Sequence, residues 1–386
     1  MPLVERMRPF TSTIFAEMSA LALRTGAINL GQGFPDTDGP PSLLADAAAA
    51  ITGGINQYPP GPGVPALRTA IAEHQRRFHG LEVHPDAVLV TSGATEAIAA
   101  AVIALCEPGD EVVTFEPYYD SYAATIAMAG ATRRTVALRP PAFGFDPAEL
   151  RAAFSDRTRV VLVNTPHNPT GAVLTREQLQ LIGSLAMQHD AVVVSDEVYE
   201  HMVFDDARHV PMATLPGMAE RTLTISSAGK TFSVTGWKIG WVHGPAELVA
   251  AVRAVKQFLT YVSGAPFQPA VASALGLPDT FYTDLAASLQ RKRDLLSDGL
   301  CAAGFTVFRP AGTYFVVTDV APLGFDDAMR FCLRLPELVG VAAVPVSVFC
   351  DDAGLGASLV RFTFCKRDEV LVEAVGRLAG LRSMAS

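Results

Sequence analysis

The sequence has no apolar stretch long enough to cross a membrane and no surplus of basic residues. A transmembrane helix needs about 20 consecutive apolar residues, so we expect no membrane partner. Thirty Lys and Arg residues stand against 39 Asp and Glu residues, which gives a formal net charge of −9. That balance argues against nucleic acid or an anionic membrane surface as a partner. Any anionic ligand must be bound locally, by a few well-placed cations and backbone amides.

Cysteine is scarce and shows neither metal-binding nor disulfide spacing. The chain has five cysteines, none of them in a CxxC pair. An odd number of isolated cysteines is typical of a reducing cytosol. The first residues, MPLVERMRPF, carry charges and prolines in place of an apolar signal core. We therefore expect a soluble, cytoplasmic protein.

The 386 residues are more than one hydrophobic core usually holds, which predicts two domains. In the middle of the chain, short apolar runs alternate with amphipathic segments, as in AVLVTSGATEAIAAAVIALC and TRVVLVNTPHNPTGAVLTREQLQLIG. This alternation predicts the buried strands of a mostly parallel sheet with helices around it. We expect an α/β large domain over residues 37–284 and a smaller α+β domain from residues 1–36 and 285–386. The high apolar content, 49%, suits a buried dimer interface.

Small and polar residues follow each predicted strand of the large domain. Because ligands of such sheets bind beyond the carboxyl ends of the strands, these turns should meet at one site. The site would combine an anion cradle at a helix start, aromatic rings, an amide, a carboxylate, a phenol and a lysine. The turns are Ser92–Glu96 (SGATE), Glu116–Tyr119 (EPYY), Thr165–Gly171 (TPHNPTG), Asp196–Tyr199 (DEVY) and Ser227–Lys230 (SAGK).

Each of these turns also has an ordinary structural interpretation. SGATE is often only a capped helix start, NPTG is usually a turn, and an isolated lysine is most often solvated. Those interpretations do not explain why all the turns fall at one edge of a sheet. A lysine, a phosphate cradle, an aromatic ring and a carboxylate are together what pyridoxal phosphate (PLP) requires. The lysine forms a Schiff base, and the carboxylate keeps the pyridine nitrogen protonated.

Three other chemistries are less well supported. GQGFPD, residues 31–36, partly matches a dinucleotide fingerprint but ends in Asp36 and lacks the strand-to-helix context. The histidines show no ligand spacing, and Glu197 with His201 is a single i,i+4 pair, so we expect no metal site. Ser227-x-x-Lys230 spells the S-x-x-K of serine acyl enzymes, but the companion K-T-G and S-D-N motifs are missing.

Taken together, the motifs identify a family. SSAGKTFSVTGWKIGW, NTPHNPTG, SDEVYE, NLGQGFPD, NQYPPGPG and LVRFTFCKRDE stand in the order found in class I aminotransferases of the fold-type I PLP enzymes. The resemblance covers essentially the whole chain and implies the α/β fold of those enzymes, a large domain plus a smaller α+β domain. The chain is most similar to the kynurenine/glutamine/methionine aminotransferase branch. FAEMSALA, GGINQYPPGPG and SGAPFQPAVA resemble the actinobacterial N-succinyldiaminopimelate aminotransferases.

The resemblance implies a cofactor role for each matching residue. Lys230 would bind PLP covalently and carry the proton between the substrate Cα and the cofactor C4′. Asp196 would pair with the pyridine nitrogen, Tyr199 and Asn168 would contact the 3-oxygen, and Tyr119 would stack on the ring. The residues that would meet the phosphate are Gly93, Ala94, Thr95, Ser227 and Lys238.

The resemblance also implies substrate contacts and a partner subunit. Arg361 would clamp the substrate α-carboxylate, helped by Asn168 and the backbone of Gly33. Tyr58 would reach the phosphate of the neighbouring subunit, which implies a homodimer with shared active sites. The residues expected to line the side-chain pocket are Phe15, Tyr122 and Phe349.

The implied reaction is the ping-pong transfer of an amino group between an amino acid and a 2-oxo acid. N-succinyl-L,L-diaminopimelate with 2-oxoglutarate, in lysine and diaminopimelate biosynthesis, is the pair that the resemblance favours. Nothing in the sequence identifies a partner for the distal succinyl carboxylate. A broad-specificity methionine, glutamine or kynurenine aminotransferase, with or without β-lyase activity, therefore stays open.

Overall fold

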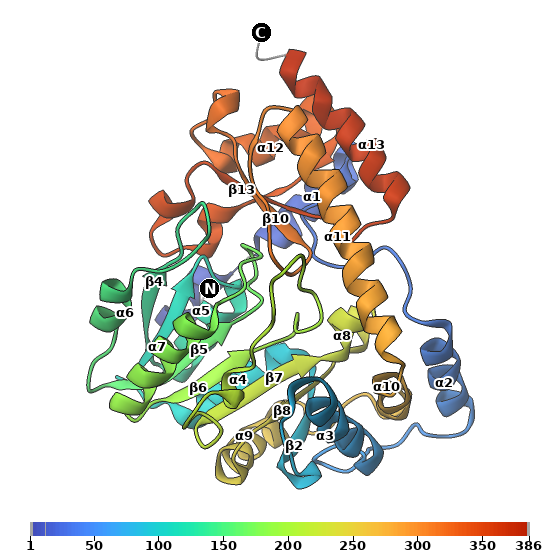
Figure 1. Ribbon diagram of the computed structural model, residues 1–386, viewed down its shortest axis with the longest axis vertical. Helices are drawn as coiled ribbons and strands as arrows, with labels where there is room; N and C mark the ends of the chain where they lie inside the picture. The colour runs from blue at the N-terminus through green and yellow to red at the C-terminus, as the bar shows by residue number, and fades with distance from the viewer. Residues whose placement is uncertain (1–2, 12, 384–386) are drawn as a thin grey trace.

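The computed structural model describes residues 3–11 and 13–383, and its largest element is a seven-stranded sheet (Figure 1). The strand order is β2-β8-β7-β6-β5-β3-β4, and only β8 runs antiparallel to its neighbours. The predicted α/β fold with a mostly parallel sheet is thus confirmed. The strands are β2 (Val88–Ser92), β3 (Glu111–Glu116), β4 (Thr132–Ala137), β5 (Thr158–Asn164), β6 (Val192–Asp196), β7 (Thr222–Ser227) and β8 (Ile239–His243).

Helices cover both faces of this sheet because successive apolar residues of each strand point to opposite sides. On β5, Val161 and Val163 pack in one buried cluster with α6 and α7, whereas Val160 and Leu162 pack in another with α4, α5 and α9. A third group, α2, α3 and α10, packs beside β2 and β8. The helices are α2 (Pro41–Thr52), α3 (Pro65–His79), α4 (Gly93–Leu105), α5 (Asp120–Ala129), α6 (Pro147–Ala153), α7 (Arg176–Gln188), α9 (Ala246–Leu259) and α10 (Phe267–Leu275).

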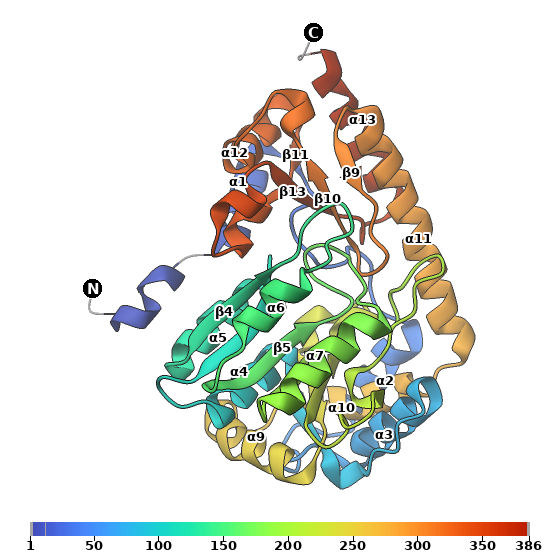
Figure 2. The same ribbon diagram turned by 60° about the vertical axis from the view of Figure 1, so that its left-hand side comes forward.

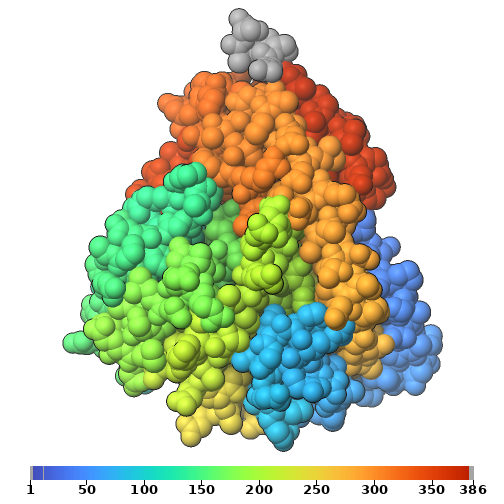
Figure 3. Space-filling model, in the orientation of Figure 1, coloured from blue at the N-terminus to red at the C-terminus, as the bar shows by residue number. Residues whose placement is uncertain are grey.

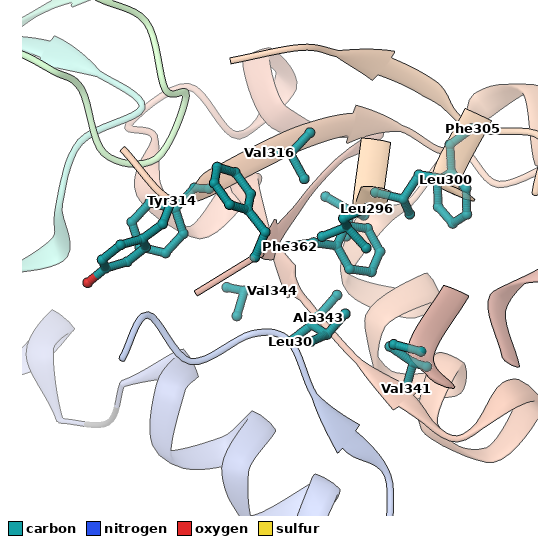
Figure 4. Packing of buried hydrophobic residues seen from close by; sticks show 14 of the residues in the cluster. Leu30, Leu296, Leu300, Phe305, Tyr314, Val316, Val341, Ala343, Val344 and Phe362 are labelled. Atoms are coloured by element: carbon teal, nitrogen blue, oxygen red, sulfur yellow. The ribbon is translucent and has the colours of Figure 1, made fainter. Parts of the chain in front are cut away.

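A four-stranded antiparallel sheet, in the order β12-β13-β10-β9, forms the second part of the molecule. The short strand β1 (Ile28–Asn29) pairs with β11 (Val341–Ala342), which attaches the N-terminal arm to the C-terminal part. Figure 4 shows the apolar packing here, with Leu30 of the arm lying near Val344 and Phe362. The other elements are β9 (Thr306–Phe308), β10 (Phe315–Asp319), β12 (Val344–Pro345), β13 (Leu359–Thr363), α1 (Ile14–Thr25), α12 (Ala328–Val339) and α13 (Asp368–Leu378).

The long helix α11 (Asp279–Ala302) runs along one side of the molecule and joins the two parts (Figure 2). The predicted domain boundary between residues 284 and 285 falls inside this helix, which continues through it without a break. The position of the boundary therefore stays a prediction. In the space-filling view the second part sits directly on the first, with the orange surface of α11 beside both (Figure 3). Within the described residues, no helix has the length and apolarity needed to cross a membrane.

Candidate active site

The carboxyl ends of the parallel strands meet the amino end of β8 at one edge of the large sheet. The register pairs Asn164 with Asp196 and Ser92 with Ile239 across neighbouring strands, which brings these turns together. A cavity of about 250 Å³ opens there, where open α/β sheets bind ligands. The predicted site residues that line it are Phe15, Gly33, Gly93, Ala94, Thr95, Tyr119, Tyr122, Asn168, Asp196, Tyr199, Ser227, Lys230, Lys238 and Arg361.

Lys230 lies in the short helix α8 (Ala228–Thr231), directly after β7, and its amine faces the cavity. Its Nζ donates a 3.1 Å hydrogen bond to the hydroxyl of Tyr314. Burial lowers the pKa of Lys230 to about 8, so the neutral amine that a general base requires is accessible near physiological pH. The described residues contain no hydrogen bond between Lys230 and Ser227, so the pair that a serine acyl enzyme needs is not formed.

Asp196 is the last residue of β6 and is buried at the floor of the cavity. Its Oδ2 accepts a 2.5 Å hydrogen bond from the hydroxyl of Tyr122. Burial raises the pKa of Asp196 to about 6, because the hydrogen bond from Tyr122 and the charge of Lys230 offset only part of the loss of water around the carboxylate. This carboxylate is therefore suited to a ligand that brings a positively charged N–H group.

The turn after β2 forms an anion cradle. Gly93 has a left-handed φ of 73° at the start of α4, and a Cβ there would lie 3.1 Å from both Nζ and Cε of Lys238. Gly240 packs against the same turn, since its Cβ would lie 2.4 Å from the carbonyl carbon of Gly93. Because Gly93 and Gly240 have no side chains, the amine of Lys238 can lie close to the first backbone N–H groups of α4. This arrangement suits a phosphate.

Arg361, on β13 of the second part, reaches into the cavity from the opposite side. Its Nη1 donates to Oδ1 of Asn168 at 3.0 Å and its Nη2 to the carbonyl of Gly31 at 2.8 Å. The guanidinium carbon lies 4.1 Å from the ring centroid of Phe315, and Nε is buried without a hydrogen-bond partner among the described residues. Burial lowers the pKa of Arg361 to about 10, which leaves the group protonated at neutral pH. A carboxylate ligand would satisfy it.

The structure separates the two neighbouring tyrosines of the EPYY turn. Tyr119 lines the cavity, whereas the hydroxyl of Tyr118 points away and donates a 2.6 Å hydrogen bond to Oδ1 of Asp351. The ring of Tyr199 also faces the cavity, with its centroid 5.6 Å from Nζ of Lys230. Of the two tyrosines in the EPYY turn, only Tyr119 is thus placed to cover a planar ligand.

Two predicted site residues lie outside the cavity lining. Phe349 is buried, with its ring centroid 5.7 Å from that of Phe15, and it lines an adjoining cavity together with Phe15 and Tyr119. Its role in the side-chain pocket stays a prediction. Tyr58 is 81% exposed and contacts Tyr261 on the surface, so any role in a site depends on a second subunit.

Several contributors to the site escaped the sequence analysis. Tyr314 and Phe315 come from the second part, in the segment GTYF, which looks like an ordinary strand start. Asn164 accepts a 2.8 Å hydrogen bond from the backbone N–H of Asn168 and donates another, also 2.8 Å, to the carbonyl of Asp196. Its position at the end of β5 was the one available signal, because polar residues at strand ends mark the ligand edge.

Away from the cavity, the structure also brings together histidines that sequence spacing did not relate. His74 of α3 and His201 share a 2.8 Å hydrogen bond between their Nε2 atoms, and ligand atoms of these two and Glu200 lie within 4.8 Å of one another. The oxygens of Glu200 are already bound by His79 and Ser226, at 2.8 and 2.7 Å. Both oxygens of Glu200 thus have partners, whereas Nδ1 of His74 is buried without a hydrogen-bond partner among the described residues. The expectation of no metal site stays a prediction.

The cavity residues fit PLP on chemical grounds. A buried carboxylate without a cation, a lysine with a lowered pKa and a glycine-lined anion cradle match the pyridine nitrogen, the aldehyde and the phosphate. The buried, unpaired Nε of Arg361 matches a substrate carboxylate.

Comparisons with known proteins agree with this geometry. The family model described as aminotransferase class I and II matches residues 25–378. A Mycobacterium tuberculosis protein named "Probable N-succinyldiaminopimelate aminotransferase" is 58% identical over 389 residues, 98% of each chain, and the Escherichia coli methionine aminotransferase is 42% identical over 96% of each chain. The solved structure of the M. tuberculosis N-succinyldiaminopimelate aminotransferase has a TM-score of 0.97, with 98% of this chain and 100% of that chain covered. The chain therefore belongs to the class I and II aminotransferases, enzymes of the PLP-dependent fold-type I architecture.

Proposed function

We propose that this aminotransferase uses PLP to transfer an amino group from N-succinyl-L,L-diaminopimelate to 2-oxoglutarate. The observation that carries the proposal is the joint placement of Lys230, Asp196 and Arg361 around one cavity. The 58% identity to the M. tuberculosis protein over almost the full length supports the choice of substrate.

The cofactor would be held by residues of the large sheet edge. Asp196 would bind the pyridine nitrogen, Tyr119 would cover the ring, and Tyr199 with Asn168 would contact the 3-oxygen. The phosphate contacts would come from Gly93, Ala94, Thr95, Ser227 and Lys238. When bound, PLP supplies the electron sink that makes the substrate Cα proton acidic.

The chain itself supplies binding, orientation and proton transfer. Arg361 would hold the α-carboxylate through its unpaired Nε and the remaining N–H groups of its Nη atoms, with Asn168 and the Gly33 backbone beside it. This fixes the Cα–H bond relative to Lys230. Lys230 would then accept the Cα proton at Nζ, which its lowered pKa allows.

The proposal includes a homodimer in the cytoplasm. Tyr58 and Tyr261 form an exposed aromatic pair, and Phe258, three residues before Tyr261 in the sequence, is 84% exposed, which suits burial by a second subunit. The five cysteines are all free, in keeping with a reducing compartment.

One observation favours a second candidate, a broad-specificity methionine, glutamine or kynurenine aminotransferase. The basic side chains that line the cavity are Lys230, Lys238 and Arg361, and each already has a proposed partner. The rings of Phe15, Phe34 and Phe315 also line the cavity, and they suit a methionine or aromatic side chain better than a distal carboxylate. A cation for the succinyl group would have to come from the second subunit.

A donor panel tests the two candidates. N-succinyl-L,L-diaminopimelate, methionine, glutamine and kynurenine are compared by kcat/KM with 2-oxoglutarate as acceptor. We expect the succinylated donor to lead by at least about tenfold, roughly 1.4 kcal/mol. A value no better than that of methionine removes the specific substrate and retains the aminotransferase. Activity in Lys230→Ala would contradict the catalytic assignment.

A further inference from the structure

Tyr314 touches the proposed base and the substrate-facing arm at the same time. It precedes β10, is 1% exposed, and its hydroxyl accepts the 3.1 Å hydrogen bond from Nζ of Lys230. The same hydroxyl donates a 2.7 Å hydrogen bond to the carbonyl of Gly33. Neither the sequence motifs nor the resemblance assigned this residue a role.

The carbonyl partner fixes the direction of both hydrogen bonds. The carbonyl oxygen of Gly33 can only accept, so the hydroxyl proton of Tyr314 points toward it. The lone pairs of the hydroxyl oxygen are then free, and Lys230 must be the donor in the other bond. A neutral amine that donates one N–H in this way has its nitrogen lone pair available for a substrate proton.

The backbone of the N-terminal arm is held tightly against this tyrosine. A Cβ on Gly33 would lie 2.5 Å from Cζ of Phe315, so only glycine allows the arm to approach so closely. Gly33 also lines the cavity on the side of Arg361. The hydroxyl of Tyr314 therefore connects the lysine amine to the segment that would meet the substrate carboxylate.

Other charged and titratable groups face Lys230 from the surrounding elements. Burial has the largest effect on the pKa of Lys230 and lowers it. The groups whose charge also affects this pKa are Cys365 beyond β13, Asp196 of β6, Lys238 before β8 and Arg361 of β13. The ring of Tyr199 lies on the remaining side. The described hydrogen bonds of Nζ include only the one to Tyr314, so this hydroxyl alone fixes the amine by a directional contact.

We propose that Tyr314 is a positioning residue for Lys230: its hydroxyl holds the free amine with the lone pair toward the substrate Cα. The inference rests on the proposed function of Lys230 as the base. Tyr314 keeps its own proton throughout, in line with burial raising its pKa well above the usual range. Orientation of a base within hydrogen-bond reach contributes to rate and not to substrate affinity.

Tyr314→Phe removes the hydroxyl and keeps the ring. With saturating PLP, we expect kcat to fall about 10- to 100-fold while KM for the amino donor changes less than about threefold. The kinetic isotope effect with Cα-deuterated donor should rise, because proton transfer becomes slower. The matched control is Tyr282→Phe, which removes a buried hydroxyl that donates 3.1 Å to the carbonyl of Leu275, outside the cavity. Its kcat and isotope effect should equal those of the unaltered enzyme.

A second measurement does not depend on turnover. In cofactor-free protein, the rate at which an amine-specific acylating reagent modifies Lys230 is followed against pH by peptide mass spectrometry. Loss of the hydroxyl acceptor disfavours the ammonium, so the apparent pKa of Lys230 in Tyr314→Phe should be lower by about 1. Tyr282→Phe should leave it unchanged.

An unchanged kcat, or a lower kcat without a change in the isotope effect or in the pKa of Lys230, overturns the proposal. If Tyr314→Phe fails to fold, Tyr314→Met, which fills similar space without a hydroxyl, is measured in the same way. Failure of the proposed function looks different: the unaltered enzyme would not transaminate, while the change in the pKa of Lys230 would still be observed.

Discussion

The hydroxyl of Tyr122, on α5, donates a 2.5 Å hydrogen bond to Oδ2 of Asp196, at the end of β6, and both side chains are buried. This bond lowers the pKa of Asp196, but burial outweighs it and holds that pKa at about 6. The family resemblance implies that Tyr122 lies in the side-chain pocket. It does line the cavity, but its polar atom serves the carboxylate.

Asp196→Asn should stabilise the cofactor-free protein and weaken cofactor binding. Because the folded pKa of about 6 lies above the ordinary value of 3.8, burying the carboxylate lowers the free energy of unfolding at pH values above about 6. That loss disappears as the pH falls below 3.8. At pH 7.5 we expect a gain of about 2–3 kcal/mol for the asparagine variant. Urea unfolding at pH 7.5 and pH 5 measures it.

Asp284→Asn, an exposed position on α11, is the control and should change stability little at either pH. An asparagine variant at position 196 that is less stable, or whose gain is the same at pH 5, would contradict the burial argument. Its affinity for PLP should nevertheless fall, because an amide cannot balance the charge of a protonated pyridine.

Tyr122→Phe should reduce PLP affinity about 10- to 100-fold. This change corresponds to the loss of one hydrogen bond to a charged group, which contributes about 1.5–3 kcal/mol. Without the hydroxyl, the pKa of Asp196 rises further, so a larger share of the carboxyl is protonated at neutral pH and cannot pair with a protonated pyridine nitrogen. Equilibrium dialysis followed by absorbance measures the dissociation constant. Tyr118→Phe, which removes the 2.6 Å bond to Asp351 outside the cavity, should keep its PLP affinity. Equal losses in the two variants would count against a direct effect through Asp196.

Arg361→Lys should raise KM for the amino donor about 100-fold while PLP affinity stays within about threefold. A lysine cannot form the two parallel bonds to a carboxylate, and it also loses the contacts with Asn168 and Gly31. Steady-state kinetics measure the change. The control, Arg309→Lys, alters an exposed ion pair with Asp294 and should leave KM unchanged. An unaltered KM in Arg361→Lys would remove Arg361 from the carboxylate site.

The sequence predicted those parts of the site that are encoded locally. Lys230, Asp196 and Asn168 each follow an apolar strand, and parallel strands bring such positions to one edge. The alternation of strands and helices likewise predicted the large sheet. Both inferences depend on neighbours in the sequence, which is why they needed no knowledge of packing.

The contacts that the sequence did not predict join distant segments. Tyr314 meets Lys230 across 84 positions, and His74 meets His201 across 127. Such pairs depend on how two parts of the molecule pack, and their local patterns, GTYF and AEHQRR, look like an ordinary strand and helix. Tyr58 illustrates a further limit, since its ring is exposed in the single chain and its proposed role depends on the proposed second subunit.

Polar contacts hold the segment 349–352 against the end of β3 and against β4. Oε2 of Glu116, which is buried, accepts a 2.5 Å hydrogen bond from the backbone N–H of Asp351, and Nε of Arg133 donates 2.8 Å to the carboxylate of Asp351. This segment carries Phe349, whose ring centroid lies 5.3 Å from the guanidinium of Arg361. The contacts thus connect the large sheet to Arg361, the proposed ligand of the substrate carboxylate.

Glu116→Gln keeps the shape of the side chain and removes its charge, so the bond to the Asp351 amide becomes a neutral one. We expect the free energy of unfolding to fall by about 1–2 kcal/mol, since charge-assisted bonds are roughly twice as strong. KM for the donor should rise a few-fold because Phe349 supports Arg361 less firmly. Urea unfolding and steady-state kinetics measure both. Glu149→Gln, which breaks an exposed ion pair with Arg139, should lose less than about 1 kcal/mol and keep its KM. If the two variants behave alike, the segment 349–352 is not held through Glu116.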